Sequence, residues 1–215
     1  MTQRLLNAIS SQYPLTELPV GEMKILKASG MTFLVQAYKA EGLGHVSVMT
    51  AKGFFGLMKM DTLIIQPKNL DLPLYSYDRI FAMSNDTLIV ELYDTCLQLP
   101  DFTALNAVKQ RFANLPERDP GEHWYDDIKL KESVSKKGKK AVSAQFNEMA
   151  LSHLQAYLSA TALPVEDTNA KMEKASYYVN GLLEKGGPST DVFKKSLGIE
   201  KTEQLFKKVL FGIEN

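Results

Sequence analysis

The first half of the chain is a series of short apolar runs, most of them joined by very short connections. Before residue 95 the runs occupy residues 23–28, 31–40, 45–51, 56–67, 79–84 and 87–94. They are rich in β-branched and aromatic residues, which favour β-strands. Connections of two to four residues join antiparallel neighbours, because a parallel crossover needs a dozen residues or more. The sequence therefore predicts about six antiparallel strands in hairpin order.

The second half of the chain changes to the helical period. Apolar spacing predicts helices over residues 2–12, 101–115, 141–161 and about 168–183, then two short helices after Gly186-Gly187-Pro188, the first capped by Ser189 and ending at Gly198. Residues 116–140 are polar and charge-rich, which predicts a long surface loop. Strands followed by helices favour an α+β fold. Because central strands are apolar on both faces, we expect a three-layer α/β/α sandwich, built as one domain over residues 1–215.

Composition excludes several classes of function. Lysine plus arginine and aspartate plus glutamate number 25 each, so no basic excess favours nucleic-acid binding. The single Cys96 excludes an internal disulfide and a cysteine-based zinc or iron–sulfur site. The three histidines lack the spacing of metal ligands, so we expect no metal. The chain shows no nucleotide fingerprint and no hydrolase motif.

The hydropathy of the sequence indicates a cellular location. No stretch of the sequence approaches 18 consecutive apolar residues, and the first residues do not read as a secretory signal. We expect no membrane span and a cytoplasmic location, or the plastid stroma if the source is a plant or alga.

One segment, DLPLYSYD at residues 71–78, is unusual for a connection between strands. Alternation after Pro73 puts Ser76 and Asp78 on one side of the chain and Tyr75 and Tyr77 on the other. A carboxyl that enters a sheet surface is costly unless it is paired or protonated, and desolvation makes it a potential proton donor. The competing interpretation is that Asp78 caps a turn or pairs with the adjacent Arg79.

Three further side chains have plain structural interpretations. His45 is expected on a strand, where it faces solvent or a polar pocket. His153 falls opposite the apolar stripe of its helix, which predicts an exposed side chain. Trp124, with Tyr125, is expected to anchor the long loop on the core.

The segment from Pro67 to Asp78 resembles the connection that ferredoxin-dependent bilin reductases carry between two central strands. The shared pattern is a proline, then Asp-Leu-Pro, then an apolar, an aromatic and a small residue, and a final aspartate two positions on: Pro67, Asp71, Leu72, Pro73, Leu74, Tyr75, Ser76 and Asp78. Residues 178–198 and 202–212 are similar to the family's closing helices. The resemblance implies the same α/β/α sandwich, a linear tetrapyrrole substrate bound between the sheet and the C-terminal helices, and no bound cofactor. It also implies single electrons from reduced ferredoxin, a bilin radical, and Asp78 as the proton donor.

Other residues follow from the same resemblance. His45 matches a family histidine and becomes a second candidate proton donor or propionate contact. Ser47 stands where some members have a glutamate and Thr62 near another histidine position. With Ser76 and Tyr178, these two are the expected substrate contacts. Gly186-Gly187 stands where some members carry a second aspartate, which implies fewer proton donors.

The resemblance also implies a partner surface and leaves alternatives open. Lys139, Lys140, Lys207 and Lys208 are the expected docking residues for acidic ferredoxin. A red chlorophyll catabolite reductase-like activity shares the fold and the ferredoxin dependence. A non-catalytic binder of linear tetrapyrroles on the same scaffold is the third possibility.

Overall fold

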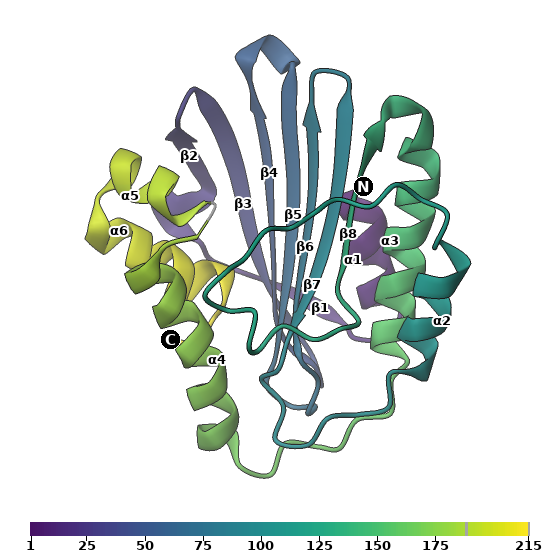
Figure 1. The fold of residues 1–215 in the computed structure, drawn as a ribbon. Helices are drawn as coiled ribbons and strands as arrows, with labels where there is room; N and C mark the ends of the chain where they lie inside the picture. The colour runs from purple at the N-terminus through teal and green to yellow at the C-terminus, as the bar shows by residue number, and fades with distance from the viewer. Residues whose placement is uncertain (188, 215) are drawn as a thin grey trace.

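The computed structural model describes residues 1–187 and 189–214. An antiparallel eight-stranded sheet forms its centre, with strands in the order β1-β3-β4-β5-β6-β7-β8 and β2 paired to β3 (Figure 1). The strands are β1 (Leu15–Leu18), β2 (Ile25–Ala28), β3 (Met31–Ala40), β4 (Gly44–Gly53), β5 (Met58–Pro67), β6 (Leu74–Ala82), β7 (Asn85–Tyr93) and β8 (Val134–Lys139). From β3 to β7 each strand pairs with the next along the chain, as the short connections predict.

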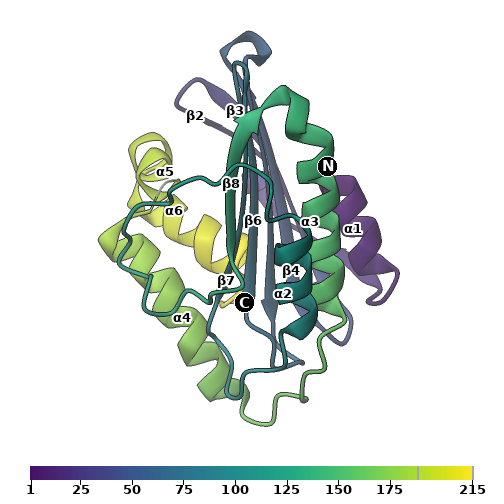
Figure 2. The same ribbon diagram turned by 45° about the vertical axis from the view of Figure 1, so that its right-hand side comes forward.

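Helices cover both faces of the sheet (Figures 1 and 2). One face, called here the α3 face, carries α1 (Thr2–Ser10), α2 (Thr103–Arg111) and α3 (Ser143–Leu158). The other, called the α4 face, carries α4 (Thr168–Lys185), α5 (Thr190–Leu197), α6 (Ile199–Gln204) and the π-helical turn η4 (Leu205–Leu210). Short 3₁₀ turns are η1 (Gly21–Lys24), η2 (Phe54–Gly56) and η3 (Lys140–Val142). The predicted α/β/α sandwich is confirmed.

Each central strand divides its side chains between two separate cores. On β5, Leu63 and Ile65 pack under the helices of the α3 face, while Ile64 between them packs on the α4 face. This alternation follows from the two-residue period of a strand. Since both faces are apolar, the sheet needs cover on both sides, which is why the fold has three layers.

The predicted strand count is too low by two. Residues 134–139 were expected within a loop, yet they form β8, paired to β7. The strand is hard to recognise in the sequence because one of its two inward positions, Val134 and Lys136, is a lysine. Lys136 is nevertheless buried, with its ammonium paired to Glu117. The other missed strand, β1, has only four residues and pairs with β3. Strand β6 also starts at Leu74 instead of residue 79, so Asp78 lies in mid-strand.

The helices agree with the predicted positions, with two corrections. Asp167 caps α4 by accepting a hydrogen bond from the Ala170 N–H at 2.9 Å. Ser189 occupies the N-cap position of α5 without a capping hydrogen bond from its side chain, and Pro188 lies outside the described residues. The prediction for His153 is wrong: its side chain is fully buried, and its Nε2 lies 3.1 Å from the Glu132 carbonyl oxygen. Among the residues described, no helix combines the length and the apolar character that a membrane crossing requires.

Candidate functional site

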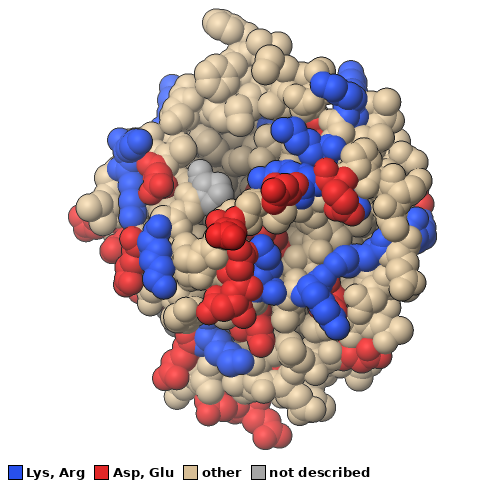
Figure 3. All heavy atoms as spheres, in the orientation of Figure 1, with Lys and Arg blue, Asp and Glu red and all other residues tan. Residues whose placement is uncertain are grey.

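A cavity of about 440 Å³ lies on the α4 face of the sheet. Strands β3 to β7 form its floor, and side chains of α4, α5 and η4 form its wall. The long connection between α2 and β8 passes over the strands on this side and contributes Arg118, His123 and Tyr125 to the lining (Figures 1 and 2). Seen from this side, the surface is hollowed in its upper half, and charged residues of both signs are interspersed around it (Figure 3). The lining is mostly apolar, which is typical of sites for small organic ligands.

Asp78 lies in the floor of this cavity, near the middle of the sheet. Its neighbours across the ladders are Thr62 on β5 and Ile89 on β7, and all three line the cavity. The Thr62 hydroxyl donates a hydrogen bond to the Asp78 carboxylate at 2.5 Å. The predicted substrate contact Thr62 is therefore the immediate partner of the predicted proton donor.

The structure separates Asp78 from Arg79, against the interpretation that the two pair. Successive strand residues point to opposite faces, so Arg79 enters the α3 face. There its guanidinium binds the Asp86 carboxylate, with an Nη2–Oδ2 distance of 2.7 Å. Within the described residues, no cationic side chain forms an ion pair with Asp78.

Burial without a cation shifts the protonation of Asp78. Desolvation raises the pKa of Asp78 from 3.8 to about 6, while the hydrogen bond from Thr62 lowers it and the negative charge of Glu91 raises it. The carboxyl faces the cavity and is half-buried. A carboxyl with this pKa is partly protonated near neutral pH, which a proton donor requires.

Ser76 and Tyr178 also line the cavity, from β6 and α4. Tyr178 stacks on Tyr93 of β7 with ring centroids 4.0 Å apart, and Tyr125 meets Tyr93 edge-on at 5.5 Å. These aromatic rings form one end of the site and join the helix, the sheet and the long connection. The structure thus brings four predicted residues together at this cavity, namely Thr62, Ser76, Asp78 and Tyr178.

His45 and Ser47 do not line this cavity. The Nε2–H of His45 donates to the Val209 carbonyl at 2.8 Å, and the Ser47 hydroxyl donates to the Leu210 carbonyl at 2.7 Å. Both side chains thereby fasten η4 to β4. Burial lowers the pKa of His45 to about 4, so this ring is neutral at pH 7 and holds no excess proton to donate. Their positions favour a structural role over the predicted contact with substrate.

The four predicted docking lysines form two separate pairs instead of one patch. Lys139 ends β8 beside Asn85, and Lys140 follows it. Lys207 and Lys208 belong to η4, which packs on β4 near Ser47. Four strand spacings of about 4.8 Å across the sheet and about six residues of ~3.3 Å along it separate the pairs, which gives a diagonal of roughly 28 Å.

Three acidic or basic residues of the cavity lining were not predicted as site residues, namely Glu91, Arg118 and His123. Glu91 on β7 has a signal in the sequence, since it interrupts the apolar run 88–93 at a position that alternation assigns to the same face as Asp78. Arg118 and His123 had no such signal, because they lie in an irregular connection whose path no periodicity reveals. The His123 Nδ1 is buried and has no hydrogen-bond partner within the described residues.

The predicted anchoring role of Trp124 and Tyr125 is confirmed. The Trp124 indole N–H donates to the Gly186 carbonyl at 2.9 Å, and its ring covers Gly181 on α4. A Cβ built on Gly181 would lie 2.1 Å from that ring, so only glycine allows this approach. Tyr125 is buried beneath. The connection over the cavity is therefore fastened to α4.

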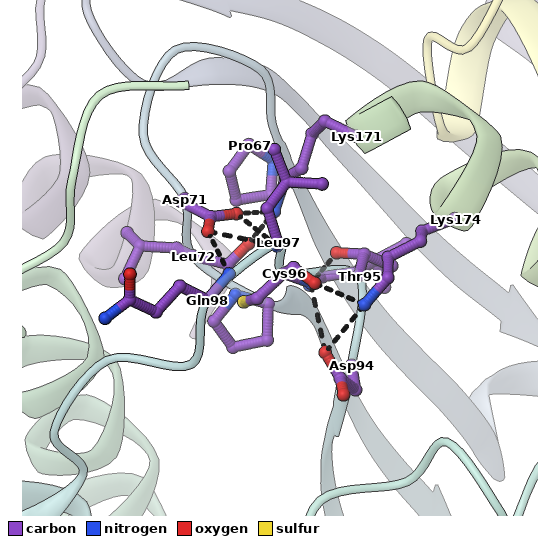
Figure 4. A network of polar contacts seen from close by, with 12 residues as sticks. Pro67, Asp71, Leu72, Asp94, Thr95, Cys96, Leu97, Gln98, Lys171 and Lys174 are labelled. Carbon is purple, nitrogen blue, oxygen red and sulfur yellow. Dashed lines mark hydrogen bonds and ion pairs between the residues drawn. The ribbon is translucent and has the colours of Figure 1, made fainter. Parts of the chain in front are cut away.

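A buried ion pair fastens the other end of α4 to the sheet (Figure 4). The Lys171 ammonium lies 3.1 Å from the Asp71 carboxylate, and both side chains are almost fully buried. Asp71 also accepts backbone hydrogen bonds from Leu97 and Gln98. The first aspartate of the DLPLYSYD segment is thus structural, and it sets the position from which β6 carries Asp78 into the cavity.

Among the described residues, no group of three or more histidine, cysteine, aspartate or glutamate side chains is arranged to hold a metal ion.

Comparison with known proteins adds a fold match. No protein-family model matches the sequence, and no curated protein matches it. The structure is similar to the crystal structure of phytochromobilin synthase from tomato in complex with biliverdin, with a TM-score of 0.79 and 14% sequence identity. The match covers 100% of this chain and 84% of that chain. The chain therefore has the α/β/α fold of phytochromobilin synthase.

Proposed function

We propose that the protein is a ferredoxin-dependent reductase of a linear tetrapyrrole of the bilin type. The observation that carries this proposal is the protonatable Asp78 carboxyl in the floor of an apolar cavity. The likeness in fold to phytochromobilin synthase, whose structure holds biliverdin, supports the choice of ligand class.

The proposed reduction needs electrons from a separate electron-transfer protein and protons from side chains in the cavity. Reduction of one double bond of a tetrapyrrole consumes two electrons and two protons. Reduced ferredoxin supplies the electrons one at a time, and Asp78 supplies protons from within the cavity. A bound tetrapyrrole displaces water from around Asp78, and this further desolvation favours the protonated carboxyl. The donor is therefore protonated when the substrate radical forms.

The lining suits a flat, conjugated ligand that carries carboxylates. Apolar and aromatic side chains of β3 to β5 and of the C-terminal helices offer surfaces for pyrrole rings. Arg118 and His123 offer hydrogen-bond donors for propionate groups, and a guanidinium matches a carboxylate in geometry and charge. A volume of about 440 Å³ falls in the usual range of small-molecule sites.

A specific observation favours a second candidate, a non-catalytic tetrapyrrole binder. His45 and Ser47 are engaged with η4, and Gly186-Gly187 offers no carboxylate. The set of proton donors is thus smaller than in family members that carry a second aspartate and a histidine donor. A binder would keep the cavity and show no reduction.

Absorption spectroscopy separates the two candidates. Biliverdin is added to the protein, and the spectrum is recorded before and after reduced ferredoxin is added without oxygen. A spectral shift on binding, followed by loss of the long conjugated system, supports the reductase. Binding without reduction supports the binder. No spectral change with biliverdin or with a linear chlorophyll catabolite rules out both.

Asp78→Asn tests the proton donor. The variant keeps the shape and the hydrogen bond from Thr62, so biliverdin still binds, while turnover falls by about 10²–10⁴-fold. The matched control is Asp61→Asn, because Asp61 lies on β5 facing the α3 face, where it pairs with the N-terminal ammonium. Turnover of Asp78→Asn equal to that of the control would exclude Asp78 as the donor.

The ferredoxin part needs its own test. The two lysine pairs are about 28 Å apart by strand spacing, so each is a separate candidate docking site. The test compares the ferredoxin concentration at half-maximal rate in two double variants. One carries Lys139→Ala and Lys140→Ala, and the other carries Lys207→Ala and Lys208→Ala. Substitution of the pair that docks ferredoxin raises that concentration, and this effect weakens at high salt because salt screens the attraction.

A further inference from the structure

Asp78 is accompanied in the cavity floor by a second carboxylate, Glu91. On the ladder between β6 and β7, Ser76 lies opposite Glu91 and Asp78 lies opposite Ile89. Asp78 and Glu91 are therefore diagonal neighbours on one face, with Cα atoms about 7–8 Å apart. Both line the same cavity, and a single water molecule or ligand atom can bridge carboxyls at this separation.

The surroundings of Glu91 hold its carboxylate in place. The Tyr93 hydroxyl donates a hydrogen bond to Glu91 Oε2 at 2.6 Å. Tyr93 itself is stacked under Tyr178 at 4.0 Å. Within the described residues, no lysine or arginine forms an ion pair with Glu91. Two acidic side chains thus share an apolar space with no neutralising cation bound to either.

The two carboxyls act on each other through this space. The negative charge of Glu91 is one of the causes that raise the pKa of Asp78. The other titratable groups that line the cavity are Tyr93 from β7, Tyr178 from α4, and Arg118, His123 and Tyr125 from the long connection, and Thr62 from β5 is the hydroxyl bound to Asp78. Of these, Arg118 is the permanent cation, and its guanidinium donates to the Ser135 hydroxyl at 3.1 Å.

We propose that Glu91 is a proton-relay residue that returns a proton to Asp78 between the two proton transfers to the tetrapyrrole. This inference rests on the proposed reductase function. Asp78 gives the first proton to the singly reduced substrate and becomes a carboxylate. Glu91 takes a proton from solvent and passes it through a bridging water to Asp78. After the second electron from ferredoxin, Asp78 gives the second proton, so two electrons and two protons enter one double bond.

A purely structural role for Glu91 makes a different prediction. In that case Glu91 serves only to accept the hydrogen bond from the Tyr93 hydroxyl. Glu91→Gln keeps an oxygen for that hydroxyl, so a structural role predicts unchanged turnover and an unchanged titration of Asp78.

The decisive experiment compares Glu91→Gln, Asp78→Asn and wild type in a single turnover with two equivalents of reduced ferredoxin. Asp78→Asn stops before the first proton transfer, whereas Glu91→Gln stops after it. The second electron still reaches the substrate in Glu91→Gln, so this variant accumulates the doubly reduced, singly protonated tetrapyrrole, with turnover reduced by about 10²-fold. That species is silent in electron paramagnetic resonance and differs in absorption from the finished product, whereas the species that accumulates in Asp78→Asn is an unprotonated radical. Full turnover in Glu91→Gln overturns the relay. Glu184→Gln, on the exposed side of α4, is the control.

A second measurement needs neither substrate nor ferredoxin. The Asp78 carboxyl is titrated by carbon NMR in the ligand-free protein, in wild type and in Glu91→Gln. Loss of the Glu91 charge lowers the pKa of Asp78 below about 6, and the alkaline limb of the rate profile, where the donor loses its proton, moves to lower pH with it. An unchanged titration overturns the coupling of the two carboxyls. If wild type binds no tetrapyrrole, the proposed function fails on its own evidence, while this titration still decides whether the carboxyls act as a pair.

Discussion

Neighbouring residues of β6 meet very different surroundings on the two faces of the sheet. Tyr75, Tyr77 and Arg79 enter the α3 face and are fully buried. Ser76 and Asp78 enter the α4 face and border a cavity of about 440 Å³. One face is filled by large side chains and by helices packed directly on it, whereas the other leaves a cavity between part of the sheet and the helices that cover it. The comparison shows how one strand stabilises the fold and presents reactive groups at the same time.

Buried charges follow the same division. On the α3 face, Arg79 and Asp86 neutralise each other, with the Ser143 carbonyl as a further acceptor for the guanidinium. On the α4 face, the one hydrogen-bond partner of the Asp78 side chain among the described residues is the Thr62 hydroxyl, so desolvation keeps the carboxyl partly protonated. A satisfied pair is inert, and an unsatisfied acid is available for chemistry.

The largest expected contrast compares adjacent residues of β5. Leu63→Ala empties space in the filled core of the α3 face and should cost about 3–5 kcal/mol of unfolding free energy. Ile64→Ala enlarges a cavity that already exists and should cost about 2 kcal/mol, because fewer packed neighbours lose contact. Denaturant unfolding measures both. Equal losses would show that the two faces are packed alike.

The buried ion pair below the cavity gives the next effect. Lys171→Met leaves the Asp71 carboxylate buried without its cation and should cost about 3 kcal/mol. Lys174→Met, one turn along α4, is the control, because its ammonium is partly exposed and should cost less than about 1 kcal/mol. Chemical denaturation of both variants tests this, and a cost for Lys171→Met as small as the control would remove the structural role of the pair.

The raised pKa of Asp78 predicts that removing its charge stabilises the protein more at high pH than at low pH. Because folding raises the pKa of Asp78, the folded state favours the protonated carboxyl, and this contribution to stability is full below about pH 4 and is lost as pH rises through about 6. Asp78→Asn should therefore match wild type at pH 4 and exceed it by roughly 2 kcal/mol at pH 8. Unfolding free energies at several pH values check the sign. A loss of stability at pH 8 would contradict it.

The smallest effect concerns the hydroxyl partner. Thr62→Val keeps the shape and removes the hydrogen bond that favours the ionised carboxyl, so the pKa of Asp78 should rise above about 6. The Thr50→Val control lies on β4 and faces the opposite side of the sheet. Carbon NMR of the Asp78 carboxyl measures the change. A pKa that falls or stays constant would mean that the hydroxyl does not stabilise the ionised form.

Local sequence patterns predicted much of the fold because connection length and side-chain alternation depend only on residues that are close in the sequence. Short connections required antiparallel neighbours, and alternation placed Asp78 and Tyr77 on opposite faces. Where the signal was weak, the predictions failed. Strand β8 was missed because its inward Lys136 reads as a solvent-facing residue, and the buried His153 was read as exposed because its backbone partner lies in another segment.

The sequence by itself determined the antiparallel sandwich, the face on which Asp78 lies and, through the family resemblance, its proposed role. Only the tertiary structure decided which side chains meet. It joined Thr62 and Glu91 to Asp78, gave Arg79 to Asp86, and brought Arg118 to the cavity. These contacts link residues from different strands and from an irregular connection. Periodicity sets the direction in which a side chain points, but its partner depends on strand register and on the path of the chain.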